Sequence, residues 1–219
     1  MVNAFFCTRP ERRTKILLTA HSLYDRAGNR KYLVARERLA FVKAATTERS
    51  EIATFCLTLA LTGARISEVL ALTPERIDIA DAAIVFETLK QRKKGIFRAV
   101  PAPRALLRQL DSVHRISKTQ VDPARRSVRL WPWGRTTAWS HVKRVMARAG
   151  IADTFAKPKA LRHAFAVEAG QNGVQLNIVQ RWLGHARIET TAIYAGALGS
   201  EERALAGRTW KNLESVLKL

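Results

Sequence analysis

Acidic residues are scarce in this chain. Only 18 of its 219 residues are Asp or Glu, against 38 Lys or Arg, so the formal net charge is +20 and the sequence pI is about 11.1. So large an excess of one sign opposes a compact fold by self-repulsion and is typical of proteins whose usual partner is a polyanion. The basic residues are spread along the chain instead of filling one amphipathic segment, which favours nucleic acid over a membrane surface as that partner.

Cysteines and long apolar runs are also few. Cys7 and Cys56 provide neither a disulfide framework nor a metal-ligand spacing, which favours an intracellular, reducing compartment. The longest apolar stretch, residues 55–63, is interrupted by threonine and is too short to span a bilayer. At the N-terminus the charges follow the apolar residues, the reverse of their order in a secretory signal. We therefore expect a cytoplasmic, nucleoid-associated protein without a membrane partner.

Several catalytic motifs are missing. The sequence contains no G-x-x-x-x-G-K-[ST], no H-E-x-x-H and no G-x-S-x-G. Its five histidines are scattered without metal-ligand spacing, and its carboxylates are too dispersed for a two-metal nuclease. We therefore expect no metal and no cofactor. Chemistry on phosphodiesters would then rely on cationic side chains to stabilise the transition state.

Apolar periodicity predicts a mostly helical chain. Helices are expected at residues 33–45, 50–63, 64–73, 103–116 and 130–151, and through 158–194 with glycine breaks at 170, 173 and 184. Ser50 and Gly63 are the predicted N-cap and stop of the second helix, and Thr136 or Thr137 is a predicted N-cap within 130–151. A polar, basic linker is expected at 117–129.

One segment has a β pattern instead. Residues 82–89 and 95–103 are rich in Ile, Val and Phe, and the basic turn 90–94 joins them, which predicts a hairpin whose tip carries four cations. The fold class expected is therefore α+β, mainly α, a helical domain with a small antiparallel β-sheet or hairpin.

Two basic clusters are candidates for holding an anion. Arg65 begins a helix directly after Gly63, with Glu68 one turn later, and an arginine beside a buried helix end needs an anionic partner or ligand. The alternative is an ordinary surface ion pair between Arg65 and Glu68. Lys159 and Arg162 lie three residues apart at another helix start, so both can point toward one anion, or both can belong to a solvated basic face.

These stretches resemble the sequence boxes of the tyrosine recombinase (phage integrase) family. Its A-R-x-S-E box is matched by residues 64–68, and its H-x-L-R-H-x-F-A box by 159–166. Its L-G-H-x-x-x-x-T-T-x-x-Y box is matched by 183–194. Order and spacing agree over roughly residues 33–197. The resemblance implies a tyrosine-recombinase-like catalytic domain at 33–197, between a short basic N-terminal appendage at 1–32 and a C-terminal helical tail at 198–219.

The resemblance also implies roles for the matching residues. Arg65 and Arg162 would hold the non-bridging oxygens of the scissile phosphate, and His185 would donate a hydrogen bond to it. Tyr194 would attack the phosphorus, giving a 3′-phosphotyrosyl bond and a free 5′-hydroxyl. A phenol with a pKa near 10 is a poor nucleophile at neutral pH, so the two arginines are expected to favour its phenolate. Glu68 would buttress Arg65.

A lysine of the hairpin would protonate the departing 5′ oxygen. Lys90 is favoured because backbone pairing at the end of the first strand fixes its direction, and Lys93 is the alternative. The cations assigned to DNA binding are Arg92, Lys93, Lys94 and Arg98. The family usually has His at the position of Lys159, which can still donate to the phosphate. His163 is assigned a supporting role.

The function implied is site-specific DNA recombination or integration, independent of metal and ATP, by a prokaryotic or mobile-element protein. The partner implied is double-stranded DNA with a specific recombination site. The resemblance also implies that four copies of the chain assemble on two synapsed DNA sites and form a Holliday junction, and that the free protein is a monomer. Two alternatives are a type IB topoisomerase and a catalytically inactive DNA-binding regulator of the same fold.

Family members usually carry a further N-terminal helical domain that closes a clamp round DNA. Only a short segment precedes the predicted domain here. A minimal recombinase, a fragment, or help from an accessory DNA-binding protein would account for this. The C-terminal segment 210–219 has an apolar helical stripe that could dock on a neighbouring protomer or pack on its own domain.

Overall fold

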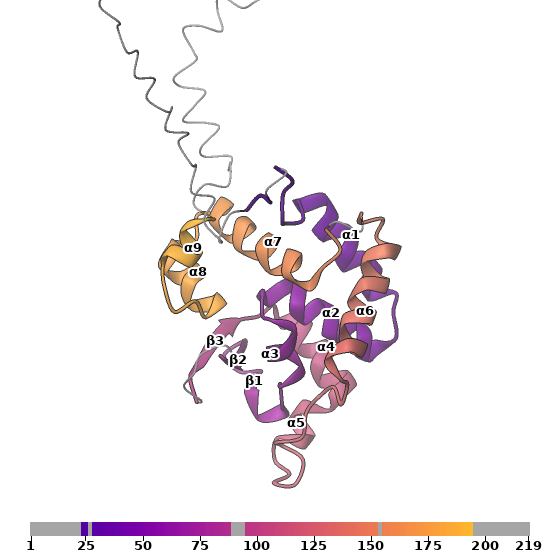
Figure 1. Ribbon diagram of the computed structural model, residues 1–219. Helices are drawn as coiled ribbons and strands as arrows, with labels where there is room; N and C mark the ends of the chain where they lie inside the picture. Colours follow the sequence, from indigo (N-terminus) through magenta and orange to yellow (C-terminus); the bar gives the residue numbers. More distant parts are fainter. Residues whose placement is uncertain (1–22, 26–27, 89–94, 153–154, 195–219) are drawn as a thin grey trace, which may run out of the picture.

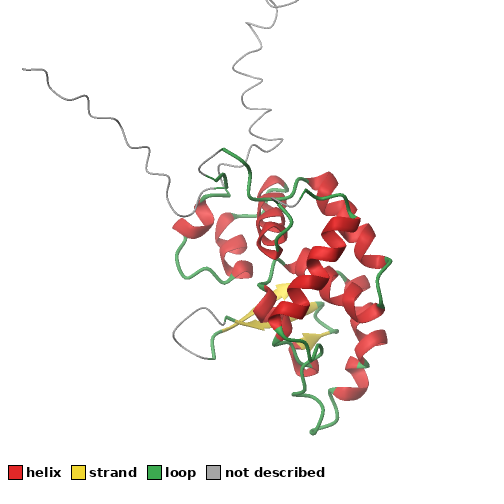
Figure 2. Cartoon of the chain, turned by 45° about the vertical axis from the view of Figure 1, so that its right-hand side comes forward, coloured by secondary structure: helices red, strands yellow, loops and turns green. Residues whose placement is uncertain are grey.

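The computed structural model describes residues 23–25, 28–88, 95–152 and 155–194. In this part of the chain helices predominate and one small sheet lies to one side of them (Figure 2). The predicted α+β, mainly helical class is confirmed. The helices are α1 (Ala35–Thr46), α2 (Ser50–Thr62), α3 (Ile66–Leu70), α4 (Arg104–His114), α5 (Ile116–Thr119), α6 (Arg135–Arg148), α7 (Pro158–Gln171), α8 (Leu176–Leu183) and α9 (Glu189–Ala192), with a short 3-10 turn, η1 (Pro74–Arg76).

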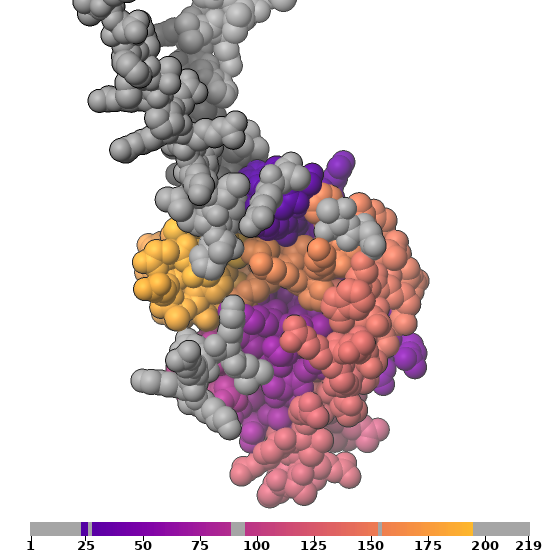
Figure 3. Space-filling model, in the orientation of Figure 1, coloured from indigo at the N-terminus to yellow at the C-terminus, as the bar shows by residue number. Residues whose placement is uncertain are grey.

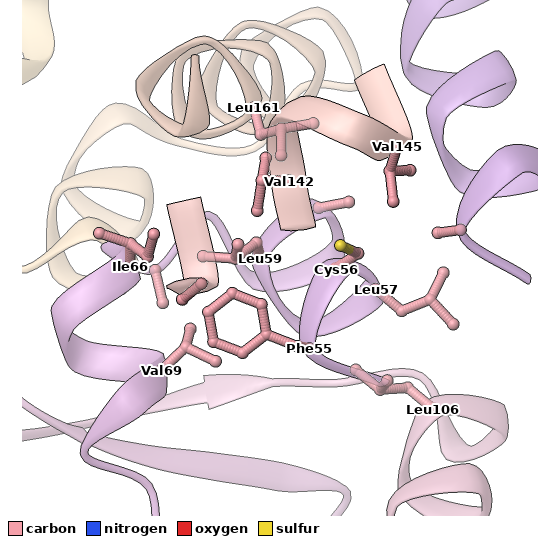
Figure 4. Close-up of a cluster of buried hydrophobic side chains, with 14 of the residues drawn as sticks. Phe55, Cys56, Leu57, Leu59, Ile66, Val69, Leu106, Val142, Val145 and Leu161 are labelled. Atoms are coloured by element: carbon pink, nitrogen blue, oxygen red, sulfur yellow. The ribbon is translucent and has the colours of Figure 1, made fainter. Parts of the chain in front are cut away.

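The central helix of the core is α2. Nine of its thirteen residues are buried, because its apolar side chains surround the helix instead of forming one stripe. It packs against α1, α3, α4 and α7, so neighbours cover it on several sides (Figure 1). Phe55, Cys56 and Leu59 lie at the centre of the resulting cluster, beside Val142 of α6 and Leu161 of α7 (Figure 4). This core fixes the helices that carry the site.

The sheet has three antiparallel strands in the order β1 (Ile77–Asp78), β2 (Ala83–Glu87) and β3 (Phe97–Pro101). The predicted hairpin is β2–β3, in which Ile84 pairs with Val100 and Phe86 with Arg98. These four residues alternate with more exposed ones and face the core. The sequence did not predict β1, which at two residues is too short to show a period-2 pattern.

Several predicted boundaries shift by a residue or more. Arg49, not Ser50, is the N-cap of α2, and Gly134, not Thr136 or Thr137, is the N-cap of α6. Gly63 ends α2 as predicted, with φ of 63°. Gly170 lies inside α7 instead of breaking it, and residues 117–119 of the predicted linker belong to α5.

Part of the predicted N-terminal appendage is attached to the helices. Leu23 is buried in a second apolar cluster with residues of α7 and α8 and with Tyr194. Tyr24 and Arg30 form an isolated β-bridge that precedes α1. Residues 1–22 and the predicted tail 198–219 lie outside the described residues. Within the described part, no helix is both long and apolar enough to cross a membrane.

Candidate active site

The candidate residues from all three sequence boxes line one cleft of about 640 Å³. Arg65 comes from the start of α3, Lys159, Arg162 and His163 from α7, and His185 and Tyr194 from the segment that follows α8. In Figure 3 the purple surface of the α2–α3 region is framed by α7 and α8–α9 above and by α6 on the right. Residues more than a hundred positions apart in the sequence therefore meet at one surface.

Arg65 is held by Glu68 at the start of α3. The Glu68 carboxylate accepts hydrogen bonds from the Arg65 backbone N–H at 2.8 Å and from Nη1 at 2.7 Å. The Glu68 side chain is fully buried, whereas about a quarter of the Arg65 side chain stays exposed. Burial raises the pKa of Glu68, but hydrogen bonds and charge from Arg98 and Arg65 outweigh it, so its pKa lies below the ordinary value. Glu68 is thus a fixed anion behind Arg65.

Arg98 is the second cation on Glu68. It donates from Nη2 to Glu68 Oε2 at 2.6 Å, from Nη1 to Thr88 Oγ1 at 3.1 Å and from Nε to the Trp182 carbonyl at 2.7 Å. Only 7% of Arg98 is exposed. The prediction that Arg98 contacts the DNA backbone is therefore wrong for this structure, because Arg98 faces inward with Phe86 and each of its three nitrogens donates to a protein group.

The sequence carried a signal that could have corrected this assignment. Arg98 alternates with Ile96 and Val100, and alternate residues of a strand share a face. An arginine on an apolar face is buried only when it is paired.

Arg162 is also buried, with 7% of the residue exposed. Its Nη1 donates to the Gly63 carbonyl at 2.8 Å and its Nη2 to the Leu183 carbonyl at 2.5 Å. These bonds join the C-terminal ends of α2 and α8, so Arg162 does not belong to a solvated basic face. Burial, then the charge of Arg65, lowers its pKa to about 9, which leaves the guanidinium cationic at neutral pH.

Tyr194 is buried, with 4% exposed, and its hydroxyl lies 2.8 Å from His163 Nδ1. Burial raises the pKa of Tyr194 to about 12, although Arg162 and Arg65 act in the opposite direction. The two arginines do favour the phenolate, as predicted, but in this state of the site they do not lower the pKa of Tyr194 below its ordinary value. Desolvation of the charged form outweighs their attraction.

His185 stacks against Tyr194, with ring centroids 6.5 Å apart and an interplanar angle of 13°. Its Nδ1 lies 2.9 Å from Thr191 Oγ1. Burial, then Arg162 and Arg65, lowers its pKa to about 3, so the ring is neutral at neutral pH. The left-handed backbone of Gly184, with φ of 64°, turns the chain from α8 toward His185.

The mouth of the cleft carries further cations. Lys159 is exposed there, and Lys157 and Arg135 line the same cleft together with Trp139. The last three were not predicted from the sequence. Lys157 lies two positions before Lys159, but nothing in the local pattern of α6 marks Arg135 or Trp139 as site residues. Tertiary packing of α3 on α6 brings them there.

Some assignments cannot be placed. Lys90, Arg92, Lys93 and Lys94 lie outside the described residues, so the choice between Lys90 and Lys93 stays a prediction. In the described part of the chain, no group of three or more His, Cys, Asp or Glu side chains is arranged to hold a metal ion.

Comparison with known proteins identifies the family. The model of the phage integrase family matches residues 31–200. The chain belongs to this family. It is 32% identical over 142 residues to the tyrosine recombinase XerD of Shewanella oneidensis, covering 61% of this chain and 45% of that protein. It is 33% identical over 140 residues to XerA of Pyrococcus furiosus, covering 61% and 46%. The chain thus spans about half the length of the curated relatives it matches.

Solved structures of recombinases share the fold. A crystal structure of XerA recombinase superposes with a TM-score of 0.64 at 24% identity, covering 81% of this chain and 64% of that chain. The catalytic domain of bacteriophage HP1 integrase superposes with a TM-score of 0.56 at 24% identity, covering 81% and 93%. The XerH site-specific recombinase bound to its difH substrate gives 0.65 at 18% identity, covering 85% and 59%. The predicted family resemblance and fold are confirmed.

Proposed function

We propose that this chain is a site-specific DNA recombinase that cuts and rejoins strands through a covalent 3′-phosphotyrosyl intermediate. The observation that carries the proposal is the meeting of Tyr194, Arg65, Arg162 and His185 in one cleft. A pure DNA-binding protein has no need of a tyrosine hydroxyl beside two guanidinium groups.

The cleft suits a phosphodiester. Arg65 keeps part of its guanidinium exposed while Glu68 fixes its direction, and Arg162 is held by two backbone carbonyls. Preorganised cations of this kind stabilise charge that develops on the non-bridging oxygens without reorganising during the reaction. Neutral His185 can add one hydrogen bond to the same oxygens.

In the proposed reaction, the Tyr194 oxygen forms a bond to phosphorus while the bond from phosphorus to the 5′ oxygen breaks. The departing oxygen takes a proton from a hairpin lysine, Lys90 or Lys93, and leaves as a 5′-hydroxyl. The phosphotyrosyl bond conserves the energy of the original phosphodiester, so a 5′-hydroxyl of another strand can reverse the step without ATP.

The proposed partner is double-stranded DNA with a specific recombination site. The net charge of +20 and the cations Arg135, Lys157 and Lys159 at the cleft mouth support a polyanionic partner. One structural neighbour, XerH, is bound to its difH substrate in the solved complex. Strand exchange between two sites further implies a homotetramer on synapsed DNA, whereas the free protein would be a monomer. An accessory DNA-binding protein would help where a clamp round the DNA is needed. We place this activity in the cytoplasm, at the nucleoid of a prokaryote or on a mobile element.

Covalent capture tests the proposal. A library of nicked duplexes with a randomised central segment is incubated with the protein, and DNA that stays attached in SDS is recovered and sequenced. The wild type should yield adducts that converge on one sequence, and Tyr194→Phe should yield none. The matched control is Tyr24→Phe, which removes a hydroxyl from an exposed tyrosine outside the cleft and should leave the yield unchanged.

The other outcomes are distinct. Retained DNA binding with no adduct from the wild type would contradict the proposal and favour a catalytically inactive regulator. Adducts without sequence preference, together with relaxation of supercoiled plasmid, would favour a type IB topoisomerase. Adducts from Tyr194→Phe would refute the choice of nucleophile.

A further inference from the structure

The proposed function leaves one step without a group to perform it, namely removal of the Tyr194 proton. Burial keeps Tyr194 as the phenol, with a pKa of about 12. A phenol attacks phosphorus efficiently only if its proton leaves as the new bond forms, so a proton acceptor within hydrogen-bond reach is required.

His163 meets that geometric requirement. Its Nδ1 lies 2.8 Å from the Tyr194 hydroxyl, and the two ring centroids are 5.7 Å apart. Both residues are buried, His163 with 7% and Tyr194 with 4% exposed, so the contact is held by its surroundings. His163 is on the first turns of α7, next to Arg162, and lines the same cleft.

The other titratable groups of the cleft suit the task less well. Lys159, Arg65 and Arg162 carry ammonium and guanidinium groups, which donate hydrogen bonds and do not accept them. His185 directs Nδ1 to Thr191 instead of to Tyr194. The Glu68 carboxylate is fully buried and is held by Arg65 and Arg98. His163 is neutral, because burial, then Lys159 and Arg162, lowers its pKa to about 4.

We propose that His163 is the general base that takes the Tyr194 proton on Nδ1 during strand cleavage, a role that rests on the proposed recombinase function. As the phenol oxygen bonds to phosphorus, its proton passes to Nδ1, and the bond from phosphorus to the 5′ oxygen breaks. The 5′ oxygen takes its own proton from the hairpin acid. In the reverse step, the imidazolium returns the proton to the departing Tyr194 oxygen.

Substrate charge makes this transfer feasible. In the cleft alone, the positive charges of Lys159 and Arg162 oppose protonation of His163. A phosphodiester held by Arg65 and Arg162 brings an anion next to these cations and offsets their effect, which raises the pKa of His163. Formation of the oxygen–phosphorus bond makes the phenol proton acidic at the same time. The proton therefore moves only when the scissile phosphate is in place.

A base at this position requires one particular tautomer. Nδ1 can accept a proton only if the neutral ring carries its hydrogen on Nε2. In the part of the chain that the structure describes, Nε2 is buried without a hydrogen-bond partner. The position of that hydrogen is therefore a direct test, independent of catalysis.

The kinetic test uses a duplex recovered by covalent capture, rebuilt with a 5′-bridging phosphorothiolate at the scissile position. A thiolate leaves without an acid, so the rate of adduct formation reports only on the nucleophile. His163→Asn keeps an amide near Nδ1 that can hold the tyrosine hydroxyl but cannot accept its proton. The control is His141→Asn, since His141 packs against Trp133 away from the cleft lining.

The wild type and His141→Asn should react at a rate independent of pH between about 7 and 9, because the neutral imidazole and the phenol both persist there. His163→Asn should react ~10²–10⁴-fold more slowly at pH 7. Its rate should then rise about tenfold per pH unit, because attack now needs the free phenolate. A rate within a few fold of the wild type, or a loss that is the same at every pH, would show a positioning role only and overturn the proposal.

Nitrogen-15 NMR of the free protein gives the second test. The wild type should show His163 as the Nε2–H tautomer at pH 7, and His163→Asn should retain a cooperative thermal transition, which shows that it folds. Finding the hydrogen on Nδ1 would overturn the base assignment whether or not adducts form. Failure of the wild type to form adducts would instead refute the recombinase proposal.

Discussion

At the residue scale, the charged groups of the site differ in burial and in hydrogen-bond partners. Arg162 is buried and bound by two carbonyls, whereas Arg65 is tied to one buried carboxylate and stays partly exposed. Two histidines and one tyrosine are kept neutral by the same low-dielectric surroundings. Among the described residues that line it, the cleft therefore has Arg and Lys side chains and no carboxylate, and a phosphodiester would supply the opposite charge.

The neutral histidines make stability depend on pH. Folding lowers the pKa of His163 from 6.5 to about 4 and that of His185 from 6.5 to about 3, mainly through burial. Below pH 6.5 the unfolded chain therefore binds more protons than the folded chain at these positions, so acid favours unfolding. We expect the free energy of unfolding to be level near pH 7–8, and to fall between pH 6.5 and about 4 by up to about 1.4 kcal/mol per pH unit for each histidine.

Urea unfolding at a series of pH values measures this effect. His185→Asn should reduce the fall in the free energy of unfolding between pH 6.5 and 4. Unfolding of this variant takes up one proton fewer, because only His163 of the two site histidines remains. Part of the slope should remain, since burial also lowers the pKa values of His114 and His141. An unchanged slope in His185→Asn would contradict the buried, neutral state assigned to this ring.

At the element scale, the ends of helices and strands position the catalytic groups. The last turn of α8 gives the Leu183 carbonyl to Arg162 and the Trp182 carbonyl to Arg98. The next residue, Gly184, turns the chain toward His185. Arg98 therefore links strand β3 to α3 and α8, and Arg162 links α7 to α8. Through Arg98 the sheet is joined to the helices that carry the site.

Gly184→Ala tests this junction. Gly184 has φ of +64°, and a Cβ there would lie 3.0–3.1 Å from the Arg98 guanidinium group. The matched control is Gly173→Ala, which has φ of +77° but open space around the added carbon. Both variants should lose about 1 kcal/mol of stability from the left-handed backbone.

Gly184→Ala should lose more stability than Gly173→Ala and should also displace His185. We expect adduct formation to fall at least ~10-fold in Gly184→Ala, because misplaced catalytic groups lose much of their effect, and to stay near wild type in Gly173→Ala. Thermal unfolding and covalent capture measure the two effects. Equal behaviour of the two variants would mean that contact with Arg98 does not position the loop.

At the scale of the whole molecule, we expect electrostatics to govern the proposed association with DNA. With a net charge of +20, binding to any duplex should weaken steeply as salt rises. If the protein contacts six to ten phosphates, affinity should fall by ~10³–10⁵ between 50 and 200 mM salt. Contacts with phosphates carry no sequence information. A duplex of scrambled sequence should therefore show nearly the same slope of log affinity against log salt.

Two arginines of α6 test which cations contact the DNA. Arg135 lines the cleft, whereas Arg148, at the other end of the helix, forms an ion pair with Glu48. Arg135→Ala should reduce the slope of log affinity against log salt by about 1, while Arg148→Ala should leave it nearly unchanged. Fluorescence anisotropy with a labelled duplex measures both slopes. The reverse order would place the DNA path away from this cleft.

Much of this protein was determined by its sequence alone. The three boxes predicted Arg65, Arg162, His185 and Tyr194 as site residues through their resemblance to those of the tyrosine recombinase family, and cationic and nucleophilic side chains of these types suit chemistry on a phosphodiester. The mainly helical class and the β2–β3 hairpin followed from periodicity, since the core selects apolar residues at the spacing of each element. Arg98 was misassigned because its charge was weighed without its place on the inward face of a strand.

Tertiary structure alone decided the electrostatic state of the site and its full set of residues. Burial is the largest cause of the shifted pKa values of Tyr194 and His163, and it could not be predicted from the sequence because desolvation depends on everything packed around a group. Arg135 and Trp139 reach the cleft through the packing of α6 against α3. The contact between His163 and Tyr194, thirty-one positions apart, exists because α7 and the segment after α8 fold together. A sequence names the groups that can react, whereas packing fixes which of them touch and what charge they carry.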